Sequence, residues 1–246
     1  MNLARVAIAS ASDIESLAHF VCHQPAICRA AQESTFMICR IALAALFFAS
    51  APLHATTYRL EPEYTQGTVR WNHLGFSHPA AQFSQGEGAM EFDAADPTKS
   101  SVTVSIPLAK ITTGVPDLDE EFQSAKFFDT AKFPNATFES SKVEKGAMPD
   151  QLKIIGELNL HGVTRPVTLM ATIIKVGTNP RSSLPNIGFE ATTTIKRSDF
   201  GLGKFVPQVS DDVRIDINVE AVDAKAYAEQ QKAEAAEEAA KAAVKK

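Results

Sequence analysis

The chain has few cysteines, and all of them lie near its beginning. Three of its 246 residues are cysteines, namely Cys22, Cys28 and Cys39. The sequence after residue 55 therefore has no disulfide, no thiol nucleophile and no cysteine-based metal site. A domain of this length must be stabilised by a hydrophobic core, which it is large enough to bury.

A strong excess of basic residues is missing as well. The chain has 24 Lys and Arg against 29 Asp and Glu, a net charge of −5. Three residues of each sign precede residue 56, so the remainder carries the same net charge. This balance offers no electrostatic attraction to nucleic acid or to an anionic membrane surface. We therefore expect no nucleic-acid partner.

The sequence also lacks recognisable catalytic motifs. It contains no Gly-x-Ser-x-Gly, His-Glu-x-x-His, P-loop or dinucleotide fingerprint. After residue 55 the histidines are His73, His78 and His161. We interpret the first two as polar residues near a barrel mouth, with metal ligation as the less favoured alternative, and His161 as a turn residue. The acidic run 117–121 suits the start of a helix. We predict no catalytic residue, no metal and no enzyme activity.

The beginning of the chain has the pattern of an export signal. Residues 37–40 form a short basic segment, residues 41–51 are apolar, and Ala55 is a small residue at a cleavage position. The apolar run is shorter than the ~20 residues that span a bilayer. We therefore predict a cleaved signal peptide at 37–55 rather than an anchor, and a periplasmic protein. Residues 1–36, which precede the signal, are interpreted as an over-extended start.

Most of the stretch from residue 56 to 223 alternates between apolar and polar residues. The alternation is clearest in 102–108, 187–195 and 213–221, and residues 154–174 read as two antiparallel strands with a turn between them. About eight strands follow one another with short connections and no ten-residue helix. The sequence therefore predicts an all-β barrel or sandwich in a single domain, and the short connections favour an antiparallel up-and-down barrel of about eight strands with short helical segments.

Two segments break this pattern. Residues 112–134 begin with turn residues and continue into a short predicted helix over 117–126, which is followed by closely spaced phenylalanines. So many aromatic side chains outside a strand must cover an apolar surface, and we interpret residues 117–138 as the lid of a ligand channel. Residues 224–246 are rich in Ala, Glu and Lys and predict a solvated helical tail, with a partner-binding helix as the alternative.

Three motifs carry a resemblance to a known family. They are the Phe127-Phe128-Asp129 and Phe133-Pro134 region, the stretch Gly156-Glu-Leu-Asn-Leu-His-Gly-Val-Thr-Arg-Pro-Val167, and Arg197-Ser-Asp-Phe-Gly-Leu202. In this order, over residues 57–222, the chain resembles the YceI-like family of exported, lipocalin-like proteins. Two departures are that Tyr64-Thr65-Gln66 stands where the family usually has a His-Ser pair, and that the acidic run 117–121 stands where it usually has a basic residue.

The resemblance implies an extended antiparallel barrel whose apolar interior binds a polyisoprenoid chain, in some members with a quinone or pyrophosphate head. We accordingly expect an isoprenoid lipid or quinone as ligand, transient contact with a membrane, and a role in transport or storage. The alternative is a filled barrel, a periplasmic stress-response or structural protein that acts through its surface or tail. The oligomeric state is left open, a dimer included. The predicted ligand-binding residues are Trp71, Phe76, Phe83, Leu118, Phe122, Phe127, Phe128, Phe133, Phe138, Phe189 and Phe200.

Overall fold

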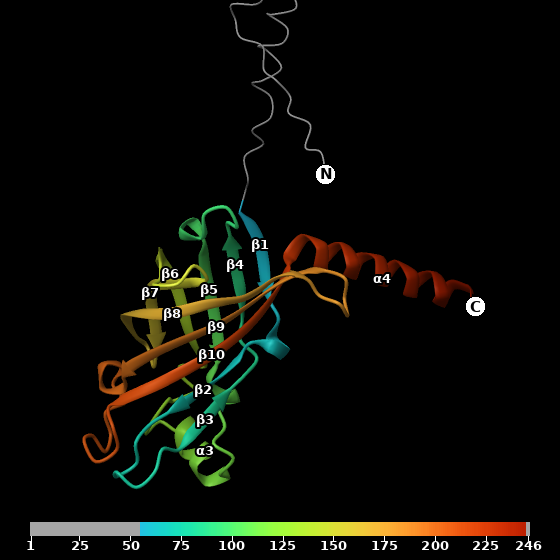
Figure 1. Cartoon of the computed structure of the whole chain (residues 1–246). Coiled ribbons are helices and arrows are strands. Elements are labelled where there is room, and N and C mark those ends of the chain that lie inside the picture. Colours follow the sequence, from blue (N-terminus) through green and yellow to red (C-terminus); the bar gives the residue numbers. More distant parts are fainter. Residues whose placement is uncertain (1–54, 245–246) are drawn as a thin grey trace, which may run out of the picture. The chain divides into compact units, whose positions relative to one another are not determined.

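The computed structural model describes residues 55–244, and its architecture is the one that the alternation predicts (Figure 1). Eight antiparallel strands close into a barrel and two further strands are attached to it. The predicted fold class is confirmed. The signal peptide at 37–55 and the over-extended start at 1–36 lie outside the described residues, apart from Ala55, and stay predictions.

Each barrel strand pairs with its neighbours in an antiparallel register. The order around the barrel is β1, β4, β5, β6, β7, β8, β9 and β10, and β10 pairs back with β1. The bounds of these strands are β1 Thr56–Leu60, β4 Glu87–Phe92, β5 Ser101–Pro107, β6 Asn135–Lys145, β7 Gln151–Leu160, β8 Val163–Thr178, β9 Pro185–Lys196 and β10 Asp212–Asp223. Closure leaves no free edge in this part of the sheet, which protects it from edge-to-edge aggregation.

The two further strands arise because long strands are interrupted. β10 pairs with β1 near one end and with β2 (Gln66–Arg70) near the other, and a short 3-10 helix at Pro62–Tyr64 separates β1 from β2. In the same way β3 (Ala80–Phe83), which pairs with β2, is separated from β4 by residues 84–86. The sequence predicts eight or nine strands, and these two interruptions raise the number to ten.

The helical elements are short except for the last. The 3-10 helices are Pro62–Tyr64, Pro97–Lys99, Leu108–Lys110 and Arg197–Phe200, and the α-helices are α3 (Pro116–Gln123) and α4 (Ala224–Val244). Pro116 occupies the first turn of α3 and Asp117 and Asp119 follow it, which suits a helix N-terminus. The predicted helix over 117–126 is thus present, slightly shorter than expected. None of the described helices is long and apolar enough to cross a membrane.

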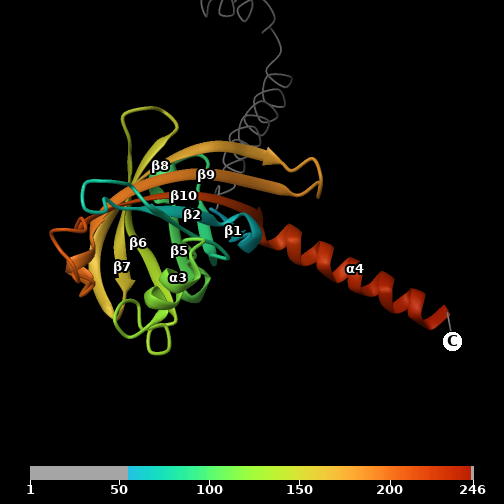
Figure 2. The same ribbon diagram turned by 90° about the horizontal axis from the view of Figure 1, so that it is seen from below.

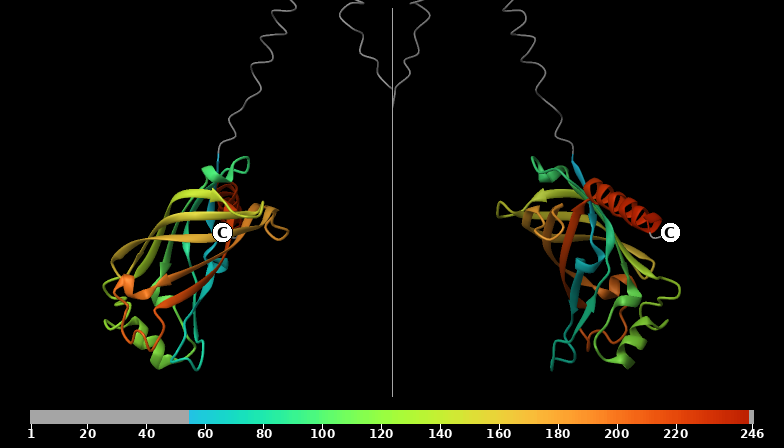
Figure 3. Two further views of the ribbon diagram at one scale, coloured as in Figure 1. Left: turned by 60° about the vertical axis from the view of Figure 1, so that its left-hand side comes forward. Right: turned by 90° about the vertical axis from the view of Figure 1, so that its right-hand side faces the viewer.

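Three connections lie together at one end of the barrel, which we call the mouth end (Figures 1 and 3). They are the segment from β5 to β6 that contains α3, the turn 71–79 between β2 and β3, and the loop 197–211 between β9 and β10. Figure 2 views the barrel from this end, with α3 in the foreground. The turn 71–79 and the loop 197–211 are joined by two backbone hydrogen bonds. The Leu74 N–H donates to the Gln208 carbonyl at 3.1 Å, and the Ser210 N–H donates to the Asn72 carbonyl at 3.0 Å.

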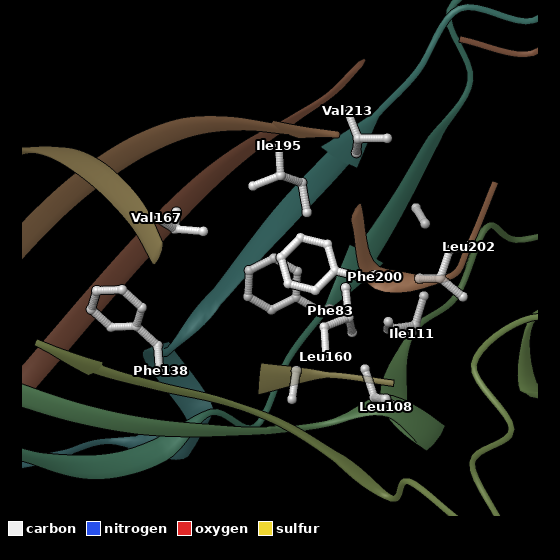
Figure 4. Packing of buried hydrophobic residues seen from close by; sticks show 12 residues of the cluster. Phe83, Leu108, Ile111, Phe138, Leu160, Val167, Ile195, Phe200, Leu202 and Val213 are labelled. Carbon is white, nitrogen blue, oxygen red and sulfur yellow. The ribbon is translucent and has the colours of Figure 1, made fainter. Parts of the chain in front are cut away.

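The buried side chains form clusters along the barrel wall. One cluster lies towards the mouth end and includes Phe83, Phe138, Phe200 and Leu202 (Figure 4). Another joins β1, β4, β9 and β10 through residues such as Phe92. We call the end of the barrel that this second cluster packs the closed end.

The tail predicted from Ala, Glu and Lys forms the single long helix α4. Beyond its first two turns its side chains are almost all exposed. The guanidinium of Arg59 lies 5.0 Å from the centre of the Tyr227 ring, where α4 meets β1. Glu237 and Lys241, four residues apart on this helix, form an ion pair with an N–O distance of 2.5 Å. An exposed pair of this kind contributes only about 0.3–0.5 kcal/mol to the helix.

Candidate functional site

The barrel interior contains a cavity of about 550 Å³. This volume falls within the range of about 300–1,000 Å³ that small-molecule sites usually have. Every second residue of a barrel strand faces the cavity. In β10 the residues that line it are Val213, Ile215, Ile217 and Val219. An antiparallel strand presents alternate side chains to one face, so this part of the wall follows from the sequence pattern.

The cavity wall is almost entirely apolar. Its charged lining residues are Glu121, Arg197 and Lys204, and all three belong to mouth-end segments. Deeper in the barrel the hydroxyl of Thr193 donates to the Thr168 carbonyl at 2.9 Å. The Thr65 hydroxyl has no partner among the described residues, but its oxygen is covered by protein atoms and does not face open space. The interior therefore suits a hydrocarbon ligand, with polar contacts available only at the mouth.

Helix α3 forms one side of the mouth and is tied to the turn before it. The Asp119 carboxylate accepts hydrogen bonds of 2.6 Å from the hydroxyls of Thr112 and Thr113 and from the Thr113 N–H. These bonds lower the pKa of Asp119. Thr112 also exchanges backbone hydrogen bonds of 2.7 and 2.9 Å with Gln82 of β3. The helix is thus held against the rim of the barrel.

An aromatic cluster fills the space beneath α3. The Phe122 ring lies at its centre, 5.7 Å from Trp71, 5.5 Å from Phe127 and 5.8 Å from Phe128 between ring centres. All four side chains are only partly buried and all line the cavity. They therefore cover the cavity without being enclosed in the core, as the interpretation of this segment as a lid requires.

The opposite side of the mouth is organised by Arg197. Its guanidinium donates to the carbonyls of Leu202, Lys204, Val209 and Ser210, at 2.7 Å for Lys204, 3.0 Å for Val209 and 2.8 Å for Ser210. Burial lowers the pKa of this arginine. With its donors engaged by the backbone, Arg197 holds the loop 197–211 in shape.

Lys204 lies in this loop and reaches across to α3. Its Nζ is 3.3 Å from Oε1 of Glu121, 4.6 Å from the centre of the Phe205 ring and 5.3 Å from that of Phe127. The ammonium group is thus flanked by two rings, an arrangement that is attractive electrostatically. The sequence gives no indication of Lys204 and Phe205, because the loop has no periodicity that could show which side chains turn inward.

Eleven residues are predicted to bind ligand, and the structure places most of them around the cavity. Those that line it are Trp71, Phe83, Leu118, Phe122, Phe127, Phe128, Phe138 and Phe189. Their contact with a ligand stays a prediction. The remaining three, Phe76, Phe133 and Phe200, lie outside the lining, so the structure does not place them at the cavity.

Phe76 lies at the tip of the turn 71–79, with 91% of its side chain exposed. The turn reverses within a few residues, since the Phe76 N–H donates to the His73 carbonyl at 3.0 Å and the Gly75 N–H to Asn72 Oδ1 at 2.7 Å. Val69, Trp71 and His73 line the cavity, so residue 76 would lie on the opposite face even if the strand continued. β2 ends at Arg70, and the turn carries the ring away from the barrel.

Phe133 and Phe200 have other packing partners. The Phe133 ring centre is 5.0 Å from that of His161, and an added Cβ on Gly162 would come within 2.4 Å of the ring, so Phe133 covers the β7–β8 turn. Phe200 is 1% exposed and is enclosed within the mouth-end core cluster. Its carbonyl lies 3.2 Å from Nδ1 of His161. The latter residue is a turn residue with a φ of 54°, as predicted.

The histidines and carboxylates of the described residues do not form a metal centre, since no group of three potential ligands comes together between residues 55 and 244. His73 lines the cavity at the mouth, whereas His78 is 3.3 Å from the amide nitrogen of Asn72. The acidic residues of α3 serve its N-terminal turn and the contact to Lys204. The site is therefore an apolar cavity with a polar rim.

Comparison with known proteins identifies the family to which this barrel belongs. The model of the YceI-like domain matches residues 58–221. Protein YceI of Escherichia coli O157:H7 is 36% identical over 187 residues, which cover 75% of this chain and 96% of that protein.

Solved structures of similar fold include the YceI protein of Campylobacter jejuni, with 29% identity, a TM-score of 0.55 and coverage of 61% of this chain and 88% of that one. A polyisoprenoid binding domain from Saccharophagus degradans shares the fold with a TM-score of 0.53 at 16% identity, covering 68% of this chain and 99% of that domain. With the barrel topology, the match over most of the described strands and the similarity to YceI proteins, the chain belongs to the YceI-like family.

Proposed function

We propose that the protein is a periplasmic lipid-binding protein that holds a polyisoprenoid chain, such as that of an isoprenoid quinone, in its barrel for transport or storage. The observation that carries this proposal is the apolar cavity of about 550 Å³ with charged side chains only at its mouth. Each CH₂ group that leaves water contributes about 0.8 kcal/mol. A hydrocarbon chain can therefore bind there without polar contacts along its length.

Two further observations support a lipid as the ligand. A domain that shares this fold is a polyisoprenoid binding domain. Around the cavity itself, the side chains of Phe122, Phe127 and Phe128 offer apolar surface that is only partly buried by the protein. These features favour a barrel that holds a ligand over a filled barrel acting through its surface or tail, and favour binding over catalysis.

The location is proposed from the sequence. The signal-like pattern at 37–55 supports export, with a mature protein beginning near Thr56. Loading from a membrane requires transient contact, and the exposed side chains of Leu74 and Phe76 at the mouth end offer apolar groups for it. Intact-mass measurement of the exported protein should give a chain that starts near residue 56. A mass that retains residues 1–50 would refute cleavage.

Native mass spectrometry tests the binding function. Protein purified from its own host, without added lipid, should carry one adduct whose mass and extracted lipid identify an isoprenoid. A protein that is detected only at the mass of its polypeptide and that takes up no isoprenoid on incubation would support the filled-barrel alternative. Turnover of an isoprenyl diphosphate by the protein would contradict the proposal that it only binds.

A further inference from the structure

The position of the charged residues fixes where the polar end of a bound lipid lies. The walls inside the barrel offer hydrocarbon, and a polar group buried there without a partner is strongly unfavourable. The charged lining residues Glu121, Arg197 and Lys204 are all at the mouth. A lipid bound with its chain in the barrel therefore places its head between α3 and the loop 197–211.

Lys204 is the cationic group of the cavity lining with the most donors left for a head group. Arg197 also lines the cavity, but its guanidinium donates to four backbone carbonyls. The Lys204 ammonium carries three N–H donors, and among the described residues its hydrogen-bond acceptor is Glu121. Its side chain is 37% exposed, and the rings of Phe127 and Phe205 flank it without accepting a conventional hydrogen bond.

Glu121 cancels the charge of this ammonium. The two groups lie 3.3 Å apart, and the Glu121 side chain is 40% exposed. Asp117 and Glu120, on the same helix, add negative charge near the mouth. A diphosphate head would thus approach a neutralised lysine beside an acidic helix, whereas an uncharged acceptor would take up a free N–H without displacing Glu121.

On this geometry, and assuming the proposed lipid-binding function, we propose that Lys204 and Glu121 select the head group of the bound lipid. Lys204 donates a hydrogen bond to an uncharged oxygen, a hydroxyl or a carbonyl, and Glu121 disfavours phosphorylated heads. The pair therefore determines specificity at the same site in which the barrel holds the chain.

The test compares two probes with the same tail, geranylgeraniol and geranylgeranyl diphosphate. Trp71 reports binding, because it is the one tryptophan of the chain and lines the cavity beside Phe122. The exported protein, freed of lipid by detergent exchange, is titrated with each probe. We expect the alcohol to bind more tightly than the diphosphate.

Three variants then distinguish a specific effect of Lys204 and Glu121 from a general effect of the charge near the mouth. Glu121→Gln should strengthen diphosphate binding by about five- to tenfold and change alcohol binding less than about threefold, since one removed charge at a partly exposed site is worth on the order of one factor of ten. Lys204→Gln should weaken the binding of both probes. Glu120→Gln removes the same charge from an exposed position of α3 outside the lining, and should shift the preference by less than about twofold.

Several outcomes would overturn the proposal. A wild-type preference for the diphosphate would do so, as would equal shifts in Glu121→Gln and Glu120→Gln or unchanged binding in Lys204→Gln. If both probes bind the wild type but the preference does not respond to Glu121→Gln, only the head-group assignment fails. If neither probe binds the correctly folded wild type, both the proposed lipid-binding function and the head-group assignment are wrong.

Discussion

The closed end of the barrel and the cluster around Phe122 at its mouth both use aromatic side chains, but they bury them to different degrees. At the closed end Phe92 is 4% exposed and packs edge-on against Tyr58 and Phe189, with ring centres 6.5 and 6.1 Å apart. At the mouth end the rings around Phe122 are only partly buried and border open space. The first arrangement stabilises the fold, and the second leaves aromatic surface for a ligand to cover.

The largest expected effect on stability lies at the closed end. Phe92→Ala should lower the free energy of unfolding by about 3–5 kcal/mol, because it leaves a void in a buried cluster. Urea denaturation monitored by circular dichroism measures it. Phe92 does not line the cavity, so the folded variant should still retain lipid. A loss below about 1 kcal/mol would mean that the closed end is no better packed than the mouth.

Phe127→Ala and Phe128→Ala should show the reverse pattern. Both rings are partly buried and face the cavity, so each change should cost less than the ~3–5 kcal/mol of a packed core phenylalanine. Lipid retention, measured by native mass spectrometry, should fall. If both variants lost the full amount of stability and kept their lipid, the rings would be core residues and the lid interpretation would be wrong.

Asp119 makes the mouth end sensitive to acid. Its pKa is lowered by hydrogen bonds from Thr112 and Thr113, so its contribution is present above the ordinary aspartate pKa of about 3.9 and is lost as the pH falls through the lowered value. Trp71 fluorescence should therefore change at a pH below about 3.9, as α3 loosens. Asp119→Asn should show part of this change already at pH 7. Identical acid titrations of the wild type and Asp119→Asn would show that Asp119 does not hold α3 in place.

Glu61, at the interruption between β1 and β2, should respond in the opposite direction. Burial raises its pKa, with the hydrogen bond from Asn186 opposing at 2.7 Å. A raised carboxyl pKa favours the folded state at low pH, and this contribution is lost as the pH rises through the folded value. Glu61→Gln should thus raise the melting temperature slightly at pH 7 and not below the ordinary glutamate pKa of about 4.3. A lower melting temperature at pH 7 would show that the charged form is required.

The smallest effect on stability is expected at Phe76. Its side chain is 91% exposed, so Phe76→Ser should change the free energy of unfolding by no more than about 0.5 kcal/mol. Flotation with phosphatidylethanolamine and phosphatidylglycerol vesicles should nevertheless show weaker membrane association. Met148→Ser is the matched control, because Met148 is an exposed residue in the β6–β7 turn. Equal flotation of both variants and the wild type would rule out contact through this turn.

The sequence predicts those features of the fold and the cavity that depend on local patterns in the chain. The period of two identifies the inward residues of long strands such as β10, and with them most of the cavity wall. The density of phenylalanines after α3 indicates a covered apolar surface. Both signals are local properties of the chain, and the structure bears out the barrel that they predict.

The misplaced residues depend on contacts between distant segments. Phe133 covers Gly162 and His161, which only the folded barrel brings to it. Phe76 lies at the tip of the turn 71–79, which backbone hydrogen bonds join to the distant loop 197–211. Lys204 meets Glu121 across 83 residues of sequence. No pattern within a single segment indicates such pairings.

A crystal structure of the protein purified from its own host tests the central claim most directly. The account predicts continuous elongated density of a single chain inside the barrel, running from Phe189 past Phe122, with its polar end beside Lys204. An interior filled by ordered water, or by side chains that have moved inward to close the space, would contradict the claim that the barrel holds a lipid.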